Sequence, residues 1–471
     1  MGPMEARYQE RLARYVTAMR GEKPDRVPIR PFVAEFAAKY AGYTCQEVTQ
    51  DYEKAFAAAR KCAADFDWDA VVGNMVYVWA GLVQAVGLRY YAVPGVDLDP
   101  GTPFQYLEPR EEGAWMRPEE YDALIEDPTG YLFNVWLPRV SADVRPPGEP
   151  GTYRNNLSFL KGGMAMLSYF SAFGGQGARL RAESGTPGAI AGILKAPLDI
   201  LADKLRGYLG LLTDLQERPA KVKRACEALL PHLAHTALSG ADPEGNLPIG
   251  FWMHRGCVPF VSMEHFRNLY WPTLRPIIEH LWAHGHQTLF YAEGNWNAHL
   301  DAFAELPDTS IVYHVDMADI VEVRRRLGGK FCLSGGVPNY LLAYGTPRQV
   351  RACVKKIIEG VAGDGGYVLD ASAIVQDDAK VENVRAMTEA GREFGGYSSG
   401  RSSLGPPRPA PAFAPAAPIR PADPAPGVCI PWDEKRCDLS PVRGDEAIVR
   451  RVWEEVDALG HMYIWQVLLS F

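Results

Sequence analysis

Three polar side chains near the middle of the chain have the types and spacing that could bind a metal ion or transfer protons. Glu293 follows the apolar run TLFYA, and the run SIVYHVD ends with His314 and Asp316. Both runs are rich in β-branched and aromatic residues, which is typical of buried strands. Side chains at the ends of neighbouring strands converge, so Glu293 and His314 could hold one ion with an open position for substrate. Alternatively, Glu293 is an acid/base group and His314 a buried, hydrogen-bonded residue.

Other residues near strand ends are candidates for the same site. Asp316 follows His314 by two positions, so both side chains point to the same face, and Asp316 could orient the imidazole or contact substrate. His254 and Arg255, in the run FWMHRG, could line the mouth of a pocket. A polar residue and five aromatic residues could contact the substrate, the aromatic ones by stacking: Asn74, Tyr77, Trp79, Trp252, Tyr291 and Trp296. For each of them the alternative is a structural role in the core.

The elements that must position these residues alternate between short apolar strands and amphipathic helices. Five strands are predicted at FWMHRG, TLFYAEGN, SIVYHVD, KFCLSGG and GYVLDAS, with helices at 297–305, 318–327 and 347–361 between them. Strands separated by helices indicate a parallel sheet, and the number of repeats favours a closed (β/α)8 TIM barrel. Such a barrel builds its active site from polar groups at the carboxyl ends of its strands.

Composition changes along the chain predict three parts. Residues 1–395 form the barrel, with an insertion or long loops over about 101–160, where prolines and aromatic residues interrupt the pattern. Residues 396–427 are a Pro/Ala-rich linker that cannot form a packed core. Residues 428–471 form a C-terminal extension with one helix, which is too small to fold alone and is expected to dock on the barrel or on a second subunit.

The overall composition excludes several classes of protein. The 471 residues are 47% hydrophobic and 23% charged, as in ordinary globular proteins. A formal net charge of −8 gives no electrostatic footprint for nucleic acid. No apolar run approaches the roughly 20 residues needed to span a bilayer. The N-terminal segment is charged and helical in pattern, unlike a secretory signal, so we expect a cytoplasmic protein without membrane association.

Three motifs, in order along the chain, resemble the uroporphyrinogen decarboxylase superfamily. RLARYVTAMRGEKPDRVPI resembles its opening helix and loop, GGVPNYLLAYGTPRQV its strand–loop–helix around G-N-x-P-x-x-L-x-x-G-T-P, and KVENVRAM the start of its closing helix. The resemblance covers residues 7–395 and implies a (β/α)8 barrel with its site at the strand carboxyl ends. This superfamily contains cofactor-free decarboxylases of uroporphyrinogen and zinc-dependent methyltransferases that work with a corrinoid protein.

Departures from the decarboxylase pattern favour the methyltransferase branch. The stretch RPFVAEFAAKYAG keeps Arg30 but lacks the rest of R-Q-A-G-R-Y, so it offers few cations to a substrate with many carboxylates. The thiolate motif H-x-C of coenzyme M methyltransferases is replaced by Tyr291-Ala292-Glu293. Some aryl-ether methyltransferases of the superfamily use a Glu…Glu…His set. This chain is similar at Glu279, Glu293 and His314, so the resemblance implies these residues as zinc ligands.

These observations predict a zinc-dependent methyltransferase. It would pass a methyl group from a methyl ether, or a related small methylated substrate, to the cobalamin of a partner corrinoid protein, with zinc acting as Lewis acid on the leaving group. No D-x-H-x-x-G corrinoid-binding motif occurs in the sequence, so the cobalamin must arrive on the partner. The resemblance also implies a homodimer. Two alternatives stay open: a metal-free decarboxylase of the uroporphyrinogen decarboxylase type, and a non-catalytic binding barrel.

Overall fold

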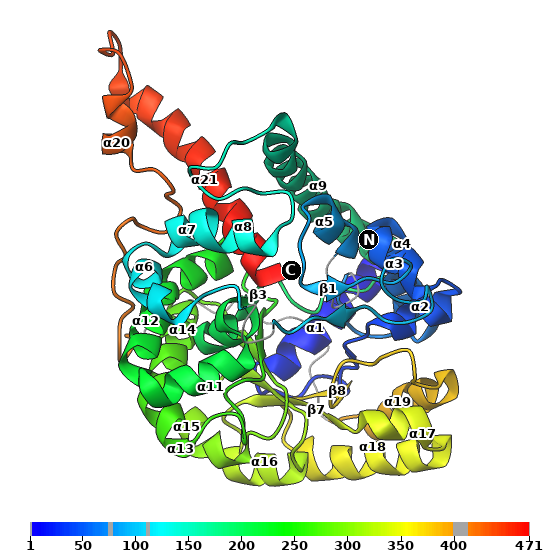
Figure 1. The fold of residues 1–471 in the computed structure, drawn as a ribbon. Helices are drawn as coiled ribbons and strands as arrows, with labels where there is room; N and C mark the ends of the chain where they lie inside the picture. Colours follow the sequence, from blue (N-terminus) through cyan, green and yellow to red (C-terminus); the bar gives the residue numbers. More distant parts are fainter. Residues whose placement is uncertain (1, 74–78, 110–113, 399–412, 471) are drawn as a thin grey trace.

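A parallel sheet forms the centre of the molecule, and helices cover its outside (Figure 1). The computed structural model describes residues 2–73, 79–109, 114–398 and 413–470. Six strands pair in chain order: β3 (Ile193–Lys195), β4 (Ile249–Met253), β5 (Thr288–Ala292), β6 (Ile311–Val315), β7 (Cys332–Val337) and β8 (Tyr367–Ala371). Every residue of β5, β6 and β8 is buried, as expected for parallel strands that are covered on both faces.

Two short strand segments, the first at Ile29 and the second at Val71, join the two edges of this sheet. Ile29 forms a parallel bridge with Leu369 of β8. The first segment also pairs with the second, because Asp69 N donates to Ile29 O at 2.8 Å. Ala189, which leads into β3, donates its N–H to Val71 O at 2.8 Å. Backbone contacts therefore run around the whole ring, and the predicted (β/α)8 fold class is confirmed.

Amphipathic helices cover the outside of the ring in the order that the sequence predicts. The helices that follow the later strands are α14 (Trp271–Ala283), α15 (Leu300–Phe303), α16 (Ile320–Leu327), α17 (Asn339–Tyr344), α18 (Pro347–Val361) and α19 (Val381–Phe394). The start of α18 is fixed by a capping box, in which Thr346 accepts from Gln349 N and the Gln349 side chain accepts from Thr346 N. The buried faces of these helices join one continuous core.

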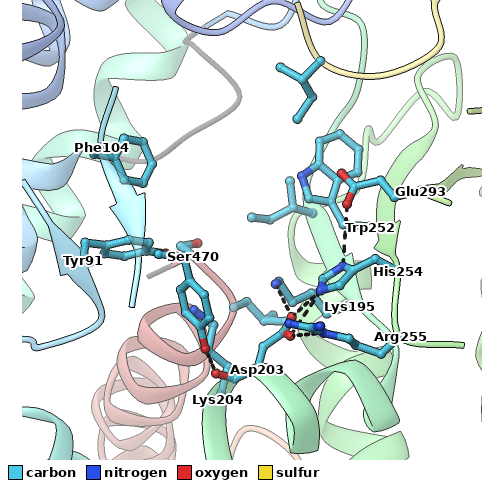
Figure 2. Close-up of a pocket in the computed structure, with 14 residues that line it drawn as sticks. Tyr91, Phe104, Lys195, Asp203, Lys204, Trp252, His254, Arg255, Glu293 and Ser470 are labelled. Atoms are coloured by element: carbon cyan, nitrogen blue, oxygen red, sulfur yellow. Dashed lines mark hydrogen bonds and ion pairs between the residues drawn. The ribbon is translucent and has the colours of Figure 1, made fainter. Parts of the chain in front are cut away.

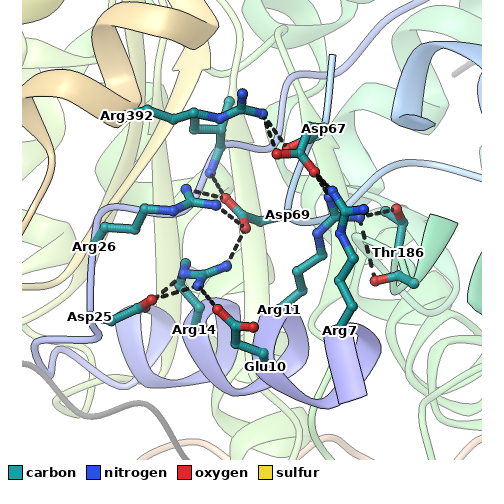
Figure 3. A network of polar contacts seen from close by, with 12 residues as sticks. Arg7, Glu10, Arg11, Arg14, Asp25, Arg26, Asp67, Asp69, Thr186 and Arg392 are labelled. Atoms are coloured by element: carbon teal, nitrogen blue, oxygen red, sulfur yellow. Dashed lines mark hydrogen bonds and ion pairs between the residues drawn. The ribbon is translucent and has the colours of Figure 1, made fainter. Parts of the chain in front are cut away.

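The N-terminal helix α1 (Pro3–Met19) is tied to the ring by a network of ion pairs (Figure 3). Asp69 is fully buried at the start of the second strand segment and accepts from Arg14 Nη1 at 2.6 Å and from both terminal nitrogens of Arg26 at 2.8 Å. It also accepts from Ile29 N at 2.8 Å. Nearby, Asp67 pairs with Arg392 of α19 at 2.7 Å. Side chains therefore reinforce the part of the ring where the strand pairing is shortest.

A long insertion separates the second strand segment from β3. It contains α5 (Ala80–Ala85), the two-stranded hairpin of β1 (Tyr91–Ala92) and β2 (Gln105–Tyr106), the helices α6 (Tyr121–Glu126), α7 (Pro128–Tyr131) and α8 (Leu137–Val140), and the long helix α9 (Tyr153–Ser184). The Gly/Ala-rich stretch that begins at Gly162 is helical within α9. Helices α10 (Pro197–Ile200), α11 (Tyr208–Glu217) and α12 (Pro219–Ser239) follow β3.

The C-terminal extension forms α20 (Trp432–Cys437) and α21 (Glu446–Ser470), and it docks on the barrel of the same chain. Figure 1 shows α20 and the first half of α21 projecting from the body, and the end of α21 beside β3. The last turns of α21 join the main core through Ile464, Trp465, Val467, Leu468 and Leu469. Burial of each such side chain contributes about 1.5–3 kcal/mol, so this end of the helix is firmly held.

Among the residues that the structure describes, none of the helices has the length and hydropathy required to traverse a lipid bilayer.

The Asp69 network yields a stability prediction. We expect Asp69→Ala to lower the free energy of unfolding by about 3–5 kcal/mol, because Arg14 and Arg26 would lose the carboxylate that compensates them. Guanidinium unfolding followed by circular dichroism measures the change. Asp308→Ala is the matched control, since Asp308 is exposed and its 2.7 Å pair with Lys330 should be worth less than about 1 kcal/mol. Equal effects of the two substitutions would contradict the structural role of Asp69.

Candidate functional site

A cavity of about 330 Å³ opens at the carboxyl ends of β3, β4 and β5 (Figure 2). Its volume lies at the lower end of the range for small-molecule sites. Charged residues of the barrel form one wall: Lys195, Asp203, Lys204, His254, Arg255 and Glu293. The other lining residues are aromatic, aliphatic or small: Tyr91, Phe104, Tyr106, Ile193, Trp252, Ile374, Leu469 and Ser470.

Asp203 is the centre of the charged wall. It lies in η4 (Leu201–Arg206), a π-helical turn that follows β3 and α10, and its side chain is only 4% exposed. Asp203 accepts from Arg255 Nε at 2.9 Å and pairs with Lys195 Nζ at 3.1 Å and His254 Nε2 at 2.9 Å. Burial would raise the pKa of the Asp203 carboxyl, but His254, Lys195 and Arg255 hold it well below its usual range. One ionised carboxylate therefore orients three cationic side chains.

Two neighbouring carboxylates fix the direction of His254. Asp199 Oδ1 accepts from the backbone N–H groups of His254 and Arg255 at 2.8 and 2.9 Å, which sets the chain at the end of β4. Burial would lower the pKa of His254, but the carboxylates of Asp203 and Asp199 outweigh it and raise that pKa above its ordinary value. The raised pKa favours the imidazolium form of His254, in which both ring nitrogens carry a proton.

Glu293 lies next to His254 on the charged wall of the cavity (Figure 2). Its Oε2 lies 3.8 Å from His254 Nδ1, an ion-pair distance longer than a hydrogen bond, and its side chain is 35% exposed. Burial raises the pKa of the Glu293 carboxyl, and His254 opposes the rise. A raised pKa favours the protonated carboxyl, which is the form that can donate a proton to a bound molecule.

Lys204, in the same helical turn as Asp203, lies beside three tyrosines, of which Tyr91 and Tyr106 line the cavity. Lys204 Nζ lies 4.5, 5.7 and 5.4 Å from the ring centroids of Tyr90, Tyr91 and Tyr106. Burial, aided by Lys195, lowers the pKa of the Lys204 ammonium well below its usual range. The rings offer flat apolar surface on which an aromatic ligand can stack.

His314, predicted as a metal ligand, lies below the cavity in the interior of the barrel. It is fully buried within β6, where its backbone pairs with Tyr291 and Ser334. Its Nδ1 is 2.9 Å from Ser334 Oγ, its Nε2 is 2.9 Å from Ser372 O, and its ring stacks on Tyr291 at 4.2 Å. Burial lowers the pKa of His314 to about 3. Both ring nitrogens are therefore engaged in the packed interior.

The three predicted zinc ligands do not fit a common metal ion. Glu279 lies on α14, where Oε1 accepts from Arg275 Nε at 2.6 Å and Oε2 accepts from Ala416 N at 2.7 Å. Its carboxylate is thus held between a helix and the C-terminal segment, while Glu293 faces the cavity. The part of the chain that the structure describes contains no group of three or more His, Cys, Asp or Glu side chains arranged to hold a metal ion.

The other predicted residues fall into two groups. His254, Arg255 and Trp252 line the cavity. Asp316 lies beside it, where its Oδ2 accepts from Gly294 N at 2.8 Å and fixes the loop that follows Glu293.

The remaining predicted aromatic residues have structural roles. Trp296 is buried and donates to Glu293 O at 2.8 Å, and Tyr291 is buried under the cavity against His314. Trp79 donates its Nε1 proton to Gln50 O at 2.7 Å. Asn74 and Tyr77 lie outside the described residues.

Several cavity residues were not predicted from the sequence. Asp203 and Lys204 occur in the segment PLDILADKLRG, which has the pattern of an ordinary amphipathic helix. The sequence offered one signal, since Lys195 ends a short apolar run just as Glu293 does. Tyr91, Phe104 and Tyr106 come from the insertion, and Leu469 and Ser470 from the C-terminal helix, so only the tertiary structure brings them to the cavity.

Comparisons with known proteins agree with this fold. Residues 177–394 match the family model of uroporphyrinogen decarboxylase (URO-D), which confirms the predicted resemblance for that part of the chain. Among solved structures, the fold is similar to that of a methyltransferase from Methanosarcina mazei, with a TM-score of 0.52 and 17% sequence identity. The similarity covers 82% of this chain and 98% of the other. A comparison with curated proteins finds no match.

The role of Asp203 can be tested by titration. We expect Asp203→Asn to lower the pKa of His254 by about 1 unit or more, because the nearest carboxylate that favours imidazolium is lost. Histidine NMR signals followed over pH measure this pKa. Asp301→Asn serves as the control, because Asp301 is an exposed residue paired with Arg326. An unchanged His254 pKa in Asp203→Asn would show that Asp203 does not govern the charge of the site.

Proposed function

We propose that this chain, whose residues 177–394 match the URO-D family model, is a methyltransferase that removes a methyl group from a small aromatic methyl ether or a related methylated compound. The acceptor would be the cobalamin of a partner corrinoid protein, since the sequence lacks a corrinoid-binding motif. The cobalamin, when bound, supplies the cobalt nucleophile that takes the methyl group. The observation that carries this proposal is Glu293, a carboxyl with raised pKa that faces an aromatic cavity next to His254.

The cavity residues have separable tasks in this reaction. The aromatic ring of the substrate lies against Trp252 and the hairpin aromatics Tyr91 and Phe104. When the bond between the methyl carbon and the ether oxygen breaks, the oxygen keeps the electron pair and takes the proton of Glu293. The carboxylate that remains is stabilised by the protonated His254 ring at 3.8 Å. Proton donation thus assists the leaving group where a phenolate or alkoxide would otherwise leave poorly.

The size of the cavity and the position of Arg30 support a small substrate rather than a porphyrinogen. A macrocycle of four pyrrole rings with eight carboxylate arms exceeds a cavity of about 330 Å³. Arg30, the cation that the decarboxylase pattern shares with this chain, is fully buried and lies 3.4 Å from Asp370, away from the cavity lining. These two observations disfavour the uroporphyrinogen decarboxylase alternative.

Replacement of Glu293 tests the proposed acid. We expect Glu293→Gln to lower kcat for demethylation of 4-methoxybenzoate by about 100-fold or more, because an amide keeps the shape but donates no proton to the ether oxygen. The assay contains cob(I)alamin and follows the release of 4-hydroxybenzoate by chromatography. Glu305→Gln is the matched control, since Glu305 is exposed and pairs with Arg275 on the outside of the barrel.

Two outcomes would overturn this proposal. Full activity of Glu293→Gln would show that Glu293 is not the proton donor. Release of carbon dioxide without loss of the methyl group would show that the reaction is a decarboxylation.

Metal removal tests how the leaving group is activated. Since Glu279 and both ring nitrogens of His314 are already engaged, we expect dialysis against a chelator to leave demethylation within about twofold of its starting rate. The zinc content before and after dialysis is measured by mass spectrometry. A loss of activity that added zinc restores would show that a metal ion, rather than Glu293 alone, assists the leaving group.

A further inference from the structure

The end of helix α21 forms part of the cavity wall. Leu469 and Ser470 line the cavity, and Figure 2 shows Ser470 across from Lys195 and His254, near Tyr91. The two residues are 3% and 6% exposed. The helix reaches this position from the C-terminal extension, more than 70 positions after the residues that match the URO-D family model end. The extension is therefore an addition that reaches the substrate cavity.

Specific contacts hold this wall in a fixed position. Trp465 stacks on His232 of α12 with ring centroids 4.8 Å apart and planes 5° apart, and its Nε1 donates to Thr129 Oγ1 at 3.2 Å. His461 Nε2 lies 3.1 Å from His232 Nδ1. These contacts come from two different elements, α12 and α7, so the last turns of α21 cannot shift without breaking several of them at once.

Close packing against α9 limits the position of α21 from another side. A Cβ atom on Gly162 would lie 2.5 Å from Val86 Cγ1 and 2.8 Å from the Tyr463 hydroxyl. Tyr463 also contacts Phe159 of α9, with ring centroids 6.5 Å apart. A side chain at Gly162 would therefore displace Val86 or Tyr463, so α9 and α21 pack closely where they cross.

We propose that Leu469 and Ser470 determine the size of ligand that the cavity accepts. On the side of the barrel, Asp203 holds the charged residues Lys195, His254 and Arg255, so this part of the lining has little freedom to adapt. The α21 side contributes one aliphatic side chain and one small side chain, which set the free space opposite Trp252 and Glu293. The ligand class, an aromatic compound of one ring with a methoxy group, rests on the proposed function.

Binding measurements on the full-length chain test this inference without requiring turnover. The probes are 4-methoxybenzoate, with one ring, and 6-methoxy-2-naphthoate, with two fused rings, and their affinities are measured by calorimetry. We expect the wild type to prefer the smaller probe by about tenfold or more, since a site whose walls are held in place excludes a ligand larger than its free space. Leu469→Ala should bind the larger probe about tenfold more tightly and change binding of the smaller one by less than about threefold.

A control and a second variant complete the experiment. Leu459→Ala removes the same side chain from an exposed position on the same helix, and it should leave both affinities unchanged. Ser470→Phe should fill the free space and weaken binding of both probes by about tenfold or more, with an unchanged melting temperature. The two variants change the space in opposite directions, so Ser470→Phe tests the proposal even where Leu469→Ala fails to fold.

The possible results separate this inference from the proposed reaction. If the variants at residues 469 and 470 change the relative affinities of the two probes as expected, the inference is supported even where no methyl transfer occurs. Only the proposed function would then be wrong. Unchanged selectivity in a folded Leu469→Ala, or undiminished binding by Ser470→Phe, overturns the inference while the proposed function stands. Failure of the wild type to bind either probe overturns the ligand class and the inference with it.

Discussion

The arrangement of the site depends on the ion pairs that the buried Asp203 carboxylate forms with the residues around it. Three cationic side chains from two strand ends, Lys195, His254 and Arg255, converge on it within 3.1 Å. An uncompensated cation would be costly in so enclosed a place, so the carboxylate and its partners require one another. The π-helical turn η4 provides the geometry, since the extra residue in such a turn changes the direction in which the following side chains point. Asp203 thereby comes to face the cavity from within a helical segment.

Much of the fold could be predicted from the sequence because the later strands are short, apolar and separated by amphipathic helices. The predicted runs TLFYAEGN and SIVYHVD contain β5 and β6, and the helix predicted at 347–361 coincides with α18. Short strands are also predicted from the sequence within EKPDRVPIRPF and at WDAVVGN, and in the structure these segments form isolated bridges and rely on Asp69 for part of their pairing. Side-chain contacts of that kind leave no periodic pattern in the sequence.

The candidate site was predicted in part, and the register of the strands explains the limits. Glu293, His254 and Arg255 follow the last residues of their strands and reach the cavity as expected. His314 does not, because it lies inside β6 and pairs with Tyr291, two residues before Glu293. In a barrel, a shift of two residues along a strand keeps the side chain facing inward but moves it to a deeper layer. Spacing along the sequence could not distinguish these layers.

The charged residues that line the cavity and many of the uncharged ones come from different parts of the chain. All six charged lining residues fall within residues 177–394, the part that matches the URO-D family model, together with Ile193, Trp252 and Ile374. The residues contributed from outside that range, Tyr91, Phe104, Tyr106, Leu469 and Ser470, carry no charge at neutral pH. The barrel therefore provides the groups that can exchange protons, while the insertion and the C-terminal helix provide surfaces that enclose a ligand. The two parts are coupled at the charged wall itself, because Glu108 of the insertion pairs with Arg255 at 3.5 Å and the Tyr106 hydroxyl donates to Asp203 O. A change in the insertion can therefore alter both the shape of the cavity and the ion pairs around Asp203.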